Sequence, residues 1–314
     1  MSKIKKRPDF TQTPEGFSRI FRILPSKRKD NKVIEREIMG AEFIDKDGRK
    51  KQISVVYRGL QHDAYALMLF LVLLAKLNVN KKDGLEILEA TDESNADIVK
   101  KLEYVIEPIG EKSDLTKLLK VETNFKELIS WLDLTYQNNN IEKVEKILEN
   151  LMQLSSIKIV VKDVESHLTK KVYSNLFLYQ SIVSNNRNQS KISIVFNPLA
   201  YFVLFSDFHF KSTINLNIAM ELSKRNINKV ILFYVISDNL KFKSEINFHI
   251  EDLFSLWTEP AKNRQTKSFR KKFIIETLKE IEELSGGTFK FEIDKNDNVT
   301  IKRMPDRKLI KSDK

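Results

Sequence analysis

The chain has 314 residues, of which 41% are hydrophobic, and this is enough to build the cores of about two domains. The formal net charge of +11 favours an anionic partner, above all nucleic acid, although a solvated lysine-rich surface that binds nothing is the alternative. The absence of cysteine excludes disulfides, thiolate metal sites and cysteine nucleophiles, and it agrees with a protein of the reducing cytoplasm.

The beginning of the chain, residues 1–32, is predicted to be a basic, flexible arm, because it combines many lysines and arginines with three prolines. No apolar stretch follows its first basic residues, so a signal peptide is not expected. Four apolar residues of the arm are spaced for a short face that docks on the folded protein: Phe17, Ile20, Phe21 and Leu24. The β-branched runs 33–44 and 52–57 come next, and the glycine-ended turn 45–48 between them predicts a β-hairpin.

The run 62–78 predicts a helix that is buried on nearly all sides, because it is apolar nearly all round. Its apolar stretch, 64–77, is shorter than the about 20 residues that a bilayer requires, so no membrane partner is expected. Another helix is predicted at 94–107, and it is expected to end before Pro108 and Gly110.

A helix, a short turn, a second helix and a β-ribbon then follow in the order that is typical of a winged helix. Thr123 or Asn124 is expected to cap the first helix, 125–134, and Glu127 lies at capping-box distance from Asn124. A polar turn at 137–140 leads to the second helix, 141–154, which has apolar residues on one face. Three β-like runs follow, at 157–161, 171–183 and 191–196.

The same order returns in the last third of the chain. Helices are predicted at 223–235, 247–256 and 266–284. Gly286 and Gly287 end the last helix, and the alternating runs 288–293 and 299–303 predict a two-stranded wing. The fold class is therefore α+β, with two tandem winged-helix domains behind a basic N-terminal arm. The predicted parts are the arm 1–32, an N-terminal domain 33–207, a C-terminal domain 208–304 and a charged tail 305–314.

The start of the last helix is the main DNA-reading candidate. Its first half is basic and its second half acidic, whereas a solvated face would usually mix both signs throughout. Phe269, Phe273 and Leu278 are expected to face the core, which leaves a cationic stripe for the major groove. An ordinary amphipathic helix with solvated charges is the alternative. The candidate residues are Lys262, Arg264, Gln265, Lys267, Ser268, Arg270, Lys271 and Lys272.

These side chains suit different parts of a DNA duplex. Arginine pairs with guanine and Gln265 with adenine, each contributing about 1 to 3 kcal/mol of discrimination. Ser268 and Lys272 are expected to hold phosphates, which position a protein without specifying sequence. The positive end of the helix dipole favours the phosphates as well.

The corresponding helix of the first domain, 141–154, mixes glutamate and lysine on its exposed face and is a weaker candidate. Asn139 and Asn140 at its start are candidates for DNA contact, with plain turn and capping roles as the alternative. Lys158 and Arg187 in the ribbon are candidates for following the DNA backbone. The first domain is therefore expected to contact DNA weakly or to make protein contacts.

Signals for an enzyme are absent or poor. The 4 histidines are scattered without helical spacing, and no G-x-x-x-x-G-K-[ST] loop is present. Tyr234 lies in an apolar helix, where a core position is favoured over a nucleophile for DNA cleavage. We expect no catalytic residue, no cofactor and no metal.

Several segments resemble plasmid replication initiators of the RepE, π and TrfA type. In the second domain these are SKRNINKVILFY (223–234), FHIEDLFSLW (248–257) and FRKKFIIETLKEIEELSGGTFKF (269–291). The N-terminal half is more similar to TrfA, through SRIFRILPSKRK (18–29) and VVYRGLQHDAYALMLFLVLLAKL (55–77).

The resemblance implies tandem winged helices that bind repeated origin sequences, called iterons, as monomers. It also implies self-association as a dimer through the N-terminal domain, melting of AT-rich DNA, and recruitment of the host replication initiator and the replicative helicase. Three other functions remain open: a winged-helix transcriptional regulator, a DNA-nicking enzyme, and a structural protein that merely tolerates its charge.

Overall fold

The computed structural model describes residues 6–14, 16–25, 33–44, 48–82, 120–153, 155–167, 169–175, 177–183, 190–196, 211–240 and 244–304. The helices are η1 (Phe17–Ile20), α1 (Ala64–Lys82), α3 (Phe125–Trp131), α4 (Asn138–Gln153), α6 (Leu216–Arg225), α7 (Lys229–Asn239), η4 (Ile250–Leu256) and α8 (Arg264–Leu284). The strands are β1 (Phe10–Pro14), β2 (Val33–Ile44), β3 (Lys50–Leu60), β4 (Lys120–Thr123), β5 (Ser155–Asp163), β6 (Thr169–Asn175), β7 (Phe177–Val183), β8 (Lys191–Phe196), β9 (Lys211–Asn215), β10 (Ser244–His249), β11 (Phe289–Ile293) and β12 (Asn298–Arg303).

This mixture of helices and antiparallel strands agrees with the predicted α+β class. Three of the predicted features lie outside the described residues: the helix at 94–107, the tail 305–314 and Arg187.

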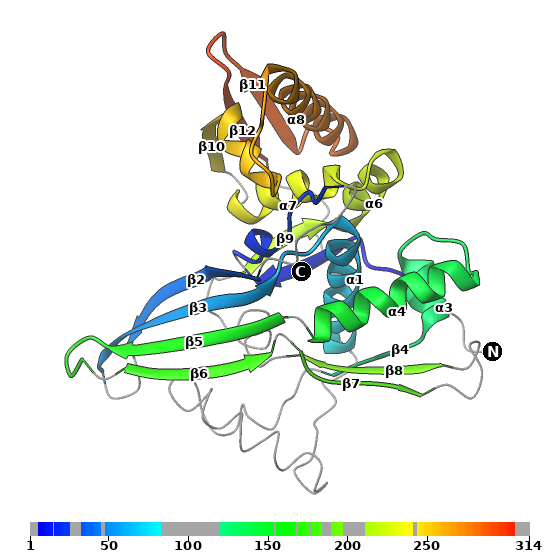
Figure 1. Ribbon diagram of the computed structural model, residues 1–314, viewed down its shortest axis with the longest axis vertical. Coiled ribbons are helices and arrows are strands. Elements are labelled where there is room, and N and C mark those ends of the chain that lie inside the picture. The colour runs from blue at the N-terminus through cyan, green and yellow to red at the C-terminus, as the bar shows by residue number, and fades with distance from the viewer. Residues whose placement is uncertain are drawn as a thin grey trace, which may run out of the picture.

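The lower half of the molecule in Figure 1 contains two antiparallel sheets. The larger has the strand order β2-β3-β5-β6, and the smaller has the order β4-β8-β7. The predicted hairpin of β2 and β3 is confirmed, and Gly48 takes a φ of 77° in its turn. The β-like run 171–183, expected as one strand, is wrong as a single element, because β6 belongs to one sheet and β7 to the other.

Helix α1 lies at the centre of the core and contacts elements of both halves. The predicted buried helix is confirmed, since every side chain from Leu69 to Leu73 is at most 1% exposed. Helix α1 contacts β1, α4, β4 and α7, and Figure 1 shows it reaching from the lower sheets toward the upper helices. Buried residues of both halves consequently form one continuous hydrophobic cluster.

The N-terminal segment is folded wherever the structure describes it, so the predicted flexible arm is wrong for 6–14 and 16–25. Strand β1 pairs antiparallel with β9, placing Phe10 opposite Asn215. The expected docking is confirmed for Phe17, Ile20 and Phe21, which are 4%, 0% and 0% exposed. It is wrong for Leu24, which is only partly buried, because Ile23 takes the inward position instead. The burial of the Phe17 and Phe21 rings in the shared core explains why a basic and proline-containing segment is ordered.

One buried carboxylate fastens this segment to the C-terminal half. Asp238, at the end of α7, accepts hydrogen bonds from the backbone N–H groups of Gly16 and Ser18 and from the Ser212 hydroxyl. Burial raises the pKa of Asp238, although these donors lower it. Gly16 has a φ of 84°, and an added Cβ would meet the Ile38 carbonyl oxygen at 1.6 Å, so this position requires glycine.

The C-terminal half differs from expectation in two elements. The helix predicted at 223–235 is two helices, α6 and α7, separated around Asn226. The helix predicted at 247–256 is strand β10 followed by the short helix η4. Strand β10 joins the predicted hairpin in a sheet of order β10-β12-β11.

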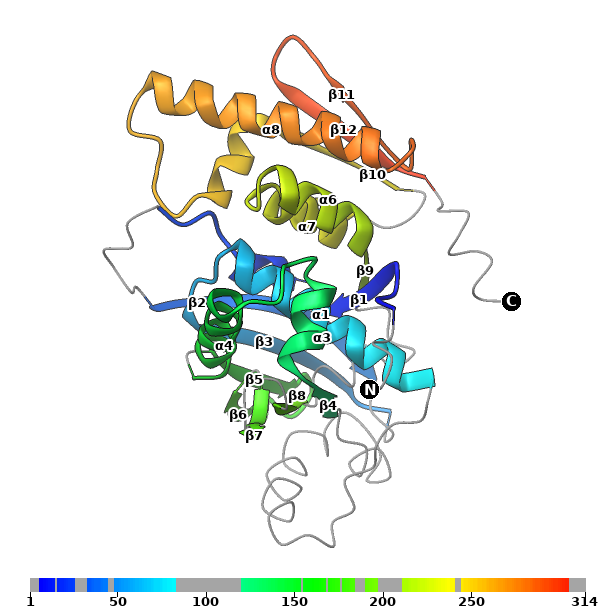
Figure 2. The same ribbon diagram turned by 90° about the vertical axis from the view of Figure 1, so that its right-hand side faces the viewer.

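The last helix and its hairpin are confirmed. Helix α8 begins after Asn263, whose side chain accepts a 2.8 Å hydrogen bond from the Thr266 N–H. It ends before Gly286 and Gly287, which have φ values of 57° and 82°. Figure 2 shows α8 lying across α6 and α7, with the hairpin of β11 and β12 beside it.

Candidate nucleic-acid interface

The buried face of α8 is shifted relative to the prediction. Its buried positions are Arg270, Phe273, Ile274, Thr277, Leu278 and Ile281. Phe269, expected in the core, is 64% exposed, so that prediction is wrong. The physical reason is helical phase: residue 270 lies one turn before 274 and two turns before 277, so position 270 takes the inward place.

Arg270 is a structural residue, although the sequence predicts it as a DNA-binding cation. It is 5% exposed, and its guanidinium donates a 2.6 Å hydrogen bond to the Glu259 carbonyl oxygen. The guanidinium also lies over the Trp257 ring, 5.0 Å from the centroid, and burial lowers its pKa. Arg270 therefore fastens the segment before α8 to the helix and does not belong to the surface available to DNA.

The other predicted cations of this region remain at the surface, and three of them have acidic partners. Lys267 lies 3.3 Å from Glu251, and Lys271 lies 2.6 Å from Asp297 in the hairpin turn. The Lys272 ammonium lies 3.7 Å from Glu276, one turn later in α8. The exposed pairs of Lys267 and Lys272 contribute about 0 to 1 kcal/mol each, so a phosphate can replace the carboxylate at little cost, whereas the pair of Lys271 and Asp297 is partly buried.

Lys262 and Arg264 are exposed, and their side chains make no ion pair with any residue that the structure describes. Gln265 and Ser268 are exposed on the following turn. No acidic residue occurs between Glu259 and Glu276 in the sequence. The first half of α8 thus presents cations and neutral hydrogen-bonding groups at the positive end of the helix, a surface suited to an anion.

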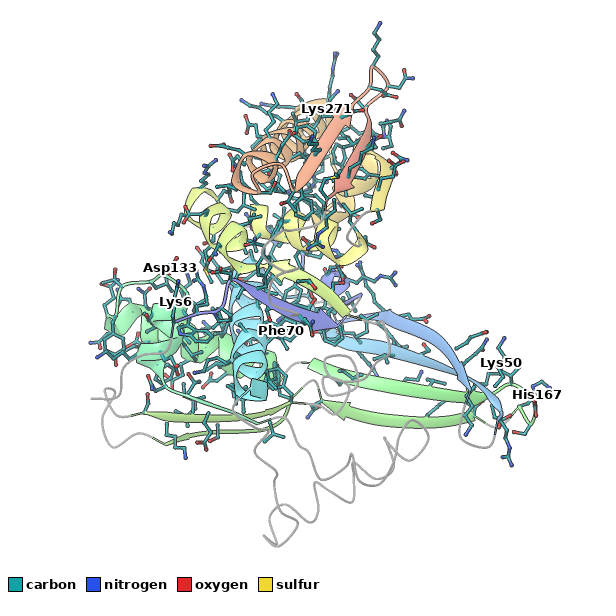
Figure 3. All side chains as sticks on the ribbon, turned by 180° about the vertical axis from the view of Figure 1, so that it is seen from behind. Lys6, Lys50, Phe70, Asp133, His167 and Lys271 are labelled. Atoms are coloured by element: carbon teal, nitrogen blue, oxygen red, sulfur yellow. The ribbon has the colours of Figure 1, made fainter. Side chains whose placement is uncertain are left out.

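The adjacent hairpin carries further exposed lysines, although Glu292 and Asp294 are exposed on it as well and Lys302 lies 3.7 Å from Glu245. Lys290, Lys295 and Lys302 are exposed on β11, in the turn and on β12, respectively. Figure 3 places Lys271 between α8 and this hairpin, at the end of the molecule that is remote from Lys50 and His167. These hairpin lysines are missing from the predicted set, although the alternation of apolar and polar residues in 289–293 was sufficient to indicate which side chains point outward.

The candidates of the first domain do not join this surface. Helix α4 begins at Asn138, so the turn predicted at 137–140 is already helical, and Asn140 donates a 2.8 Å hydrogen bond to the Thr135 carbonyl. Asn140 is therefore occupied in a turn, while Asn139 is exposed. Lys158 lies in β5, 3.9 Å from Glu35. Figure 1 shows α4 and β5 in the half of the molecule opposite α8.

The tyrosine weighed as a nucleophile for DNA cleavage is a core residue. Tyr234 is 0% exposed, and burial raises the pKa of its hydroxyl well above the ordinary value, so neither access nor ionisation favours attack on a phosphate. Within the described part of the chain, no group of three or more His, Cys, Asp or Glu residues is placed to hold a metal ion. None of the described helices is long and apolar enough to cross a membrane.

No protein-family model matches the sequence, and no curated protein does. Among solved structures, the chain is similar to a selenomethionine form of domains 2 and 3 of RctB, with 11% identity and a TM-score of 0.48 over 93% of this chain and 97% of that one. A second structure of RctB domains 2–3 matches with 10% identity and a TM-score of 0.45, over 94% and 99% of the two chains. At these values the likeness assigns neither a family nor a function to the chain.

Proposed function

We propose that this chain is a sequence-specific double-stranded-DNA-binding initiator of plasmid replication, and that α8 is its DNA-reading helix. The observation that carries the proposal is the surface of the first half of α8. Cations and amide or hydroxyl groups are exposed there, and this part of the helix contains no acidic residue. A helix that inserts its N-terminal residues into the major groove requires this distribution.

Each exposed side chain receives a role from its chemistry. Arg264 and Gln265, in the first turn, read base edges, the arginine at guanine and the glutamine at adenine. Ser268, Lys262 and Lys272 hold phosphates. Lys267 and Lys271 exchange their carboxylate partners for phosphates when DNA binds.

The finer architecture belongs to the same proposal. The C-terminal domain, 208–304, is a winged helix in which the hairpin of β11 and β12 forms the wing beside α8. The N-terminal domain, 33–207, is a second winged helix built around α3 and α4. It contacts DNA more weakly, through Lys158 and its neighbours, and mediates a homodimer in equilibrium with the monomer.

The sequence resemblance to RepE-type initiators supplies the biological setting. The DNA ligand is a set of iterons at a plasmid origin in the cytoplasm, and the partners are the host replication initiator and the replicative helicase. No enzymatic activity, cofactor or metal is part of the proposal.

Selection from a random pool of duplexes tests the DNA-binding part of the proposal. The full-length protein should enrich one sequence and bind it with a steep salt dependence, because several phosphate contacts release counterions. Equal affinity for selected and random DNA at moderate salt would refute a sequence-specific role.

A transformation assay then separates an initiator from a transcriptional regulator. The gene and its adjacent DNA are placed on a plasmid without another origin. Persistence of that plasmid supports initiation. A protein that binds the selected sequence but cannot maintain the plasmid is a regulator instead.

A further inference from the structure

Phe269 is the most exposed of the large hydrophobic residues in the described part of the chain. It is 64% exposed, compared with 57% for Val33 and 49% for Met304. Its neighbour Arg270 and the next phenylalanine, Phe273, are both buried. The core of the C-terminal half is therefore complete without the Phe269 ring.

The surroundings of Phe269 are those of the proposed DNA surface. Gln265 lies one turn before it and Lys272 one turn after it, so the three side chains share the outward side of α8. Both neighbours are exposed, and no acidic residue precedes Glu276 in this helix. A helix that presents Gln265 and Lys272 to a duplex must present the phenyl ring between them as well.

A phenyl ring has no hydrogen-bonding group, which restricts what it can contact in the major groove. Most groups on the groove edges of the bases are donors or acceptors, and the 5-methyl group of thymine is the largest apolar group among them, since cytosine presents only a C5–H. A ring pressed against a donor or acceptor would remove water without replacing its hydrogen bond, at a free-energy cost. Against the thymine methyl, the ring buries apolar surface on both sides.

We propose that Phe269 is a specificity-determining residue that packs against the 5-methyl group of a thymine in the bound site. This inference rests on the proposed function and deepens it, because it names one base and one atom group that α8 reads. The alternative partner of the exposed ring is another protein surface, and one outcome of the test below identifies that partner.

The test replaces thymine by uracil, which lacks only the methyl group. The probe is the duplex that the wild-type protein enriches from a random pool, with each thymine of the site changed to deoxyuridine in turn. Affinity is measured by fluorescence anisotropy. At one thymine, we expect the wild-type protein to bind about fourfold more weakly to the uracil duplex, the equivalent of one buried methyl group.

The Phe269→Ala variant should bind the thymine duplex more weakly than the wild type does and should no longer distinguish thymine from uracil at that position. The affinity ratio is taken within one protein preparation, so a partly unfolded variant still gives a valid answer. Val33→Ala removes a comparably exposed apolar side chain from β2 and should keep the fourfold ratio.

The outcomes separate this inference from the proposed function. A Phe269→Ala variant that still prefers thymine fourfold overturns the inference, and so does a wild-type protein that is insensitive at every thymine of an enriched site. In both cases the DNA-binding proposal stands. If the pool yields no enriched sequence, both fail. If Phe269→Ala changes the sedimentation of the free protein and leaves the ratio unchanged, the ring contacts protein and not DNA.

Discussion

Helices α4 and α8 follow the same packing rule but carry different surfaces. Both bury a stripe of apolar side chains, which includes Val144 and Leu148 in α4 and Ile274 and Leu278 in α8. The exposed side of α4 alternates in charge along its length, with Glu142, Lys146 and Glu149 exposed. In α8 the first half contains only cations among its charged residues, and the acidic residues begin at Glu276.

The difference shows that burial and charge carry separate information. The apolar stripe of each helix packs in the core, whereas the exposed charges lie on the opposite side. The segregation of sign in α8 is not needed for packing, so it points to a ligand. In α4, by contrast, even a lysine is used locally: the Lys143 ammonium lies 3.2 Å from the centroid of the Tyr65 ring.

Charge reversal on α8 should have the largest effect on DNA binding. We expect Arg264→Glu with Lys272→Glu to weaken binding to the selected duplex on the order of 100-fold, because two contacts become repulsive. Lys126→Glu with Lys146→Glu, at exposed positions of α3 and α4, makes the same change in net charge and should have a much smaller effect. Anisotropy titrations at one salt concentration measure both. Equal losses would mean that net charge alone attracts DNA.

Arg270 should separate stability from binding within α8. We expect Arg270→Ala to lower the free energy of unfolding by about 2 kcal/mol, because it removes a buried hydrogen bond and the stacking on Trp257. Lys272→Ala, two positions later, should leave stability unchanged. Urea denaturation measures both. A stable Arg270→Ala variant with altered base preference would show that Arg270 contacts DNA and is not a structural residue.

The salt dependence of DNA binding should change more when a lysine of the C-terminal half is removed than when one of the N-terminal half is removed. Lys262→Ala should reduce the slope of log K against log salt concentration by about 0.9, the value for one lost phosphate contact. Lys158→Ala in β5 should reduce it by less. Binding isotherms over a series of salt concentrations give both slopes, and the reverse order would move the main DNA surface to the first domain.

The smallest effect is expected at the start of α4. Asn140→Ala should cost about 1 kcal/mol of stability, since its side chain donates to the Thr135 carbonyl, and it should not change DNA affinity. Thermal unfolding and anisotropy measure the two quantities. A loss of affinity with unchanged stability would contradict the structural role.

The sequence predicts elements whose signals are local. The apolar run of α1, the turn glycine Gly48 and the cap and glycine stop of α8 each lie within a few residues of the element that they specify. The sequence of 245–249 also carries a local signal of a strand, the alternation of polar and apolar residues, yet the helical pattern predicts a helix from 247. Its pairing with β12, 49 to 59 positions away in the chain, decides the outcome.

Other features depended on partners that are distant in sequence. The buried position of Arg270 depends on its contacts with the Trp257 ring and the Glu259 carbonyl. The periodicity of α8 does not indicate these partners. The break between α6 and α7 contains neither glycine nor proline, so no breaker marks it. No local pattern indicates strand β1, because its partner, β9, is about 200 residues away.

The pairing of β1 with β9 also imposes an order of events at the ribosome. Asp9 and Asn217, which are hydrogen-bonded to each other, are 208 positions apart. At roughly 5 to 20 residues per second, synthesis separates them by on the order of 10 to 40 s. During that interval the rings of Phe17 and Phe21 have no finished core to enter, and a chaperone has time to bind them. Strand β1 is thus synthesised about 200 residues before the strand with which it pairs.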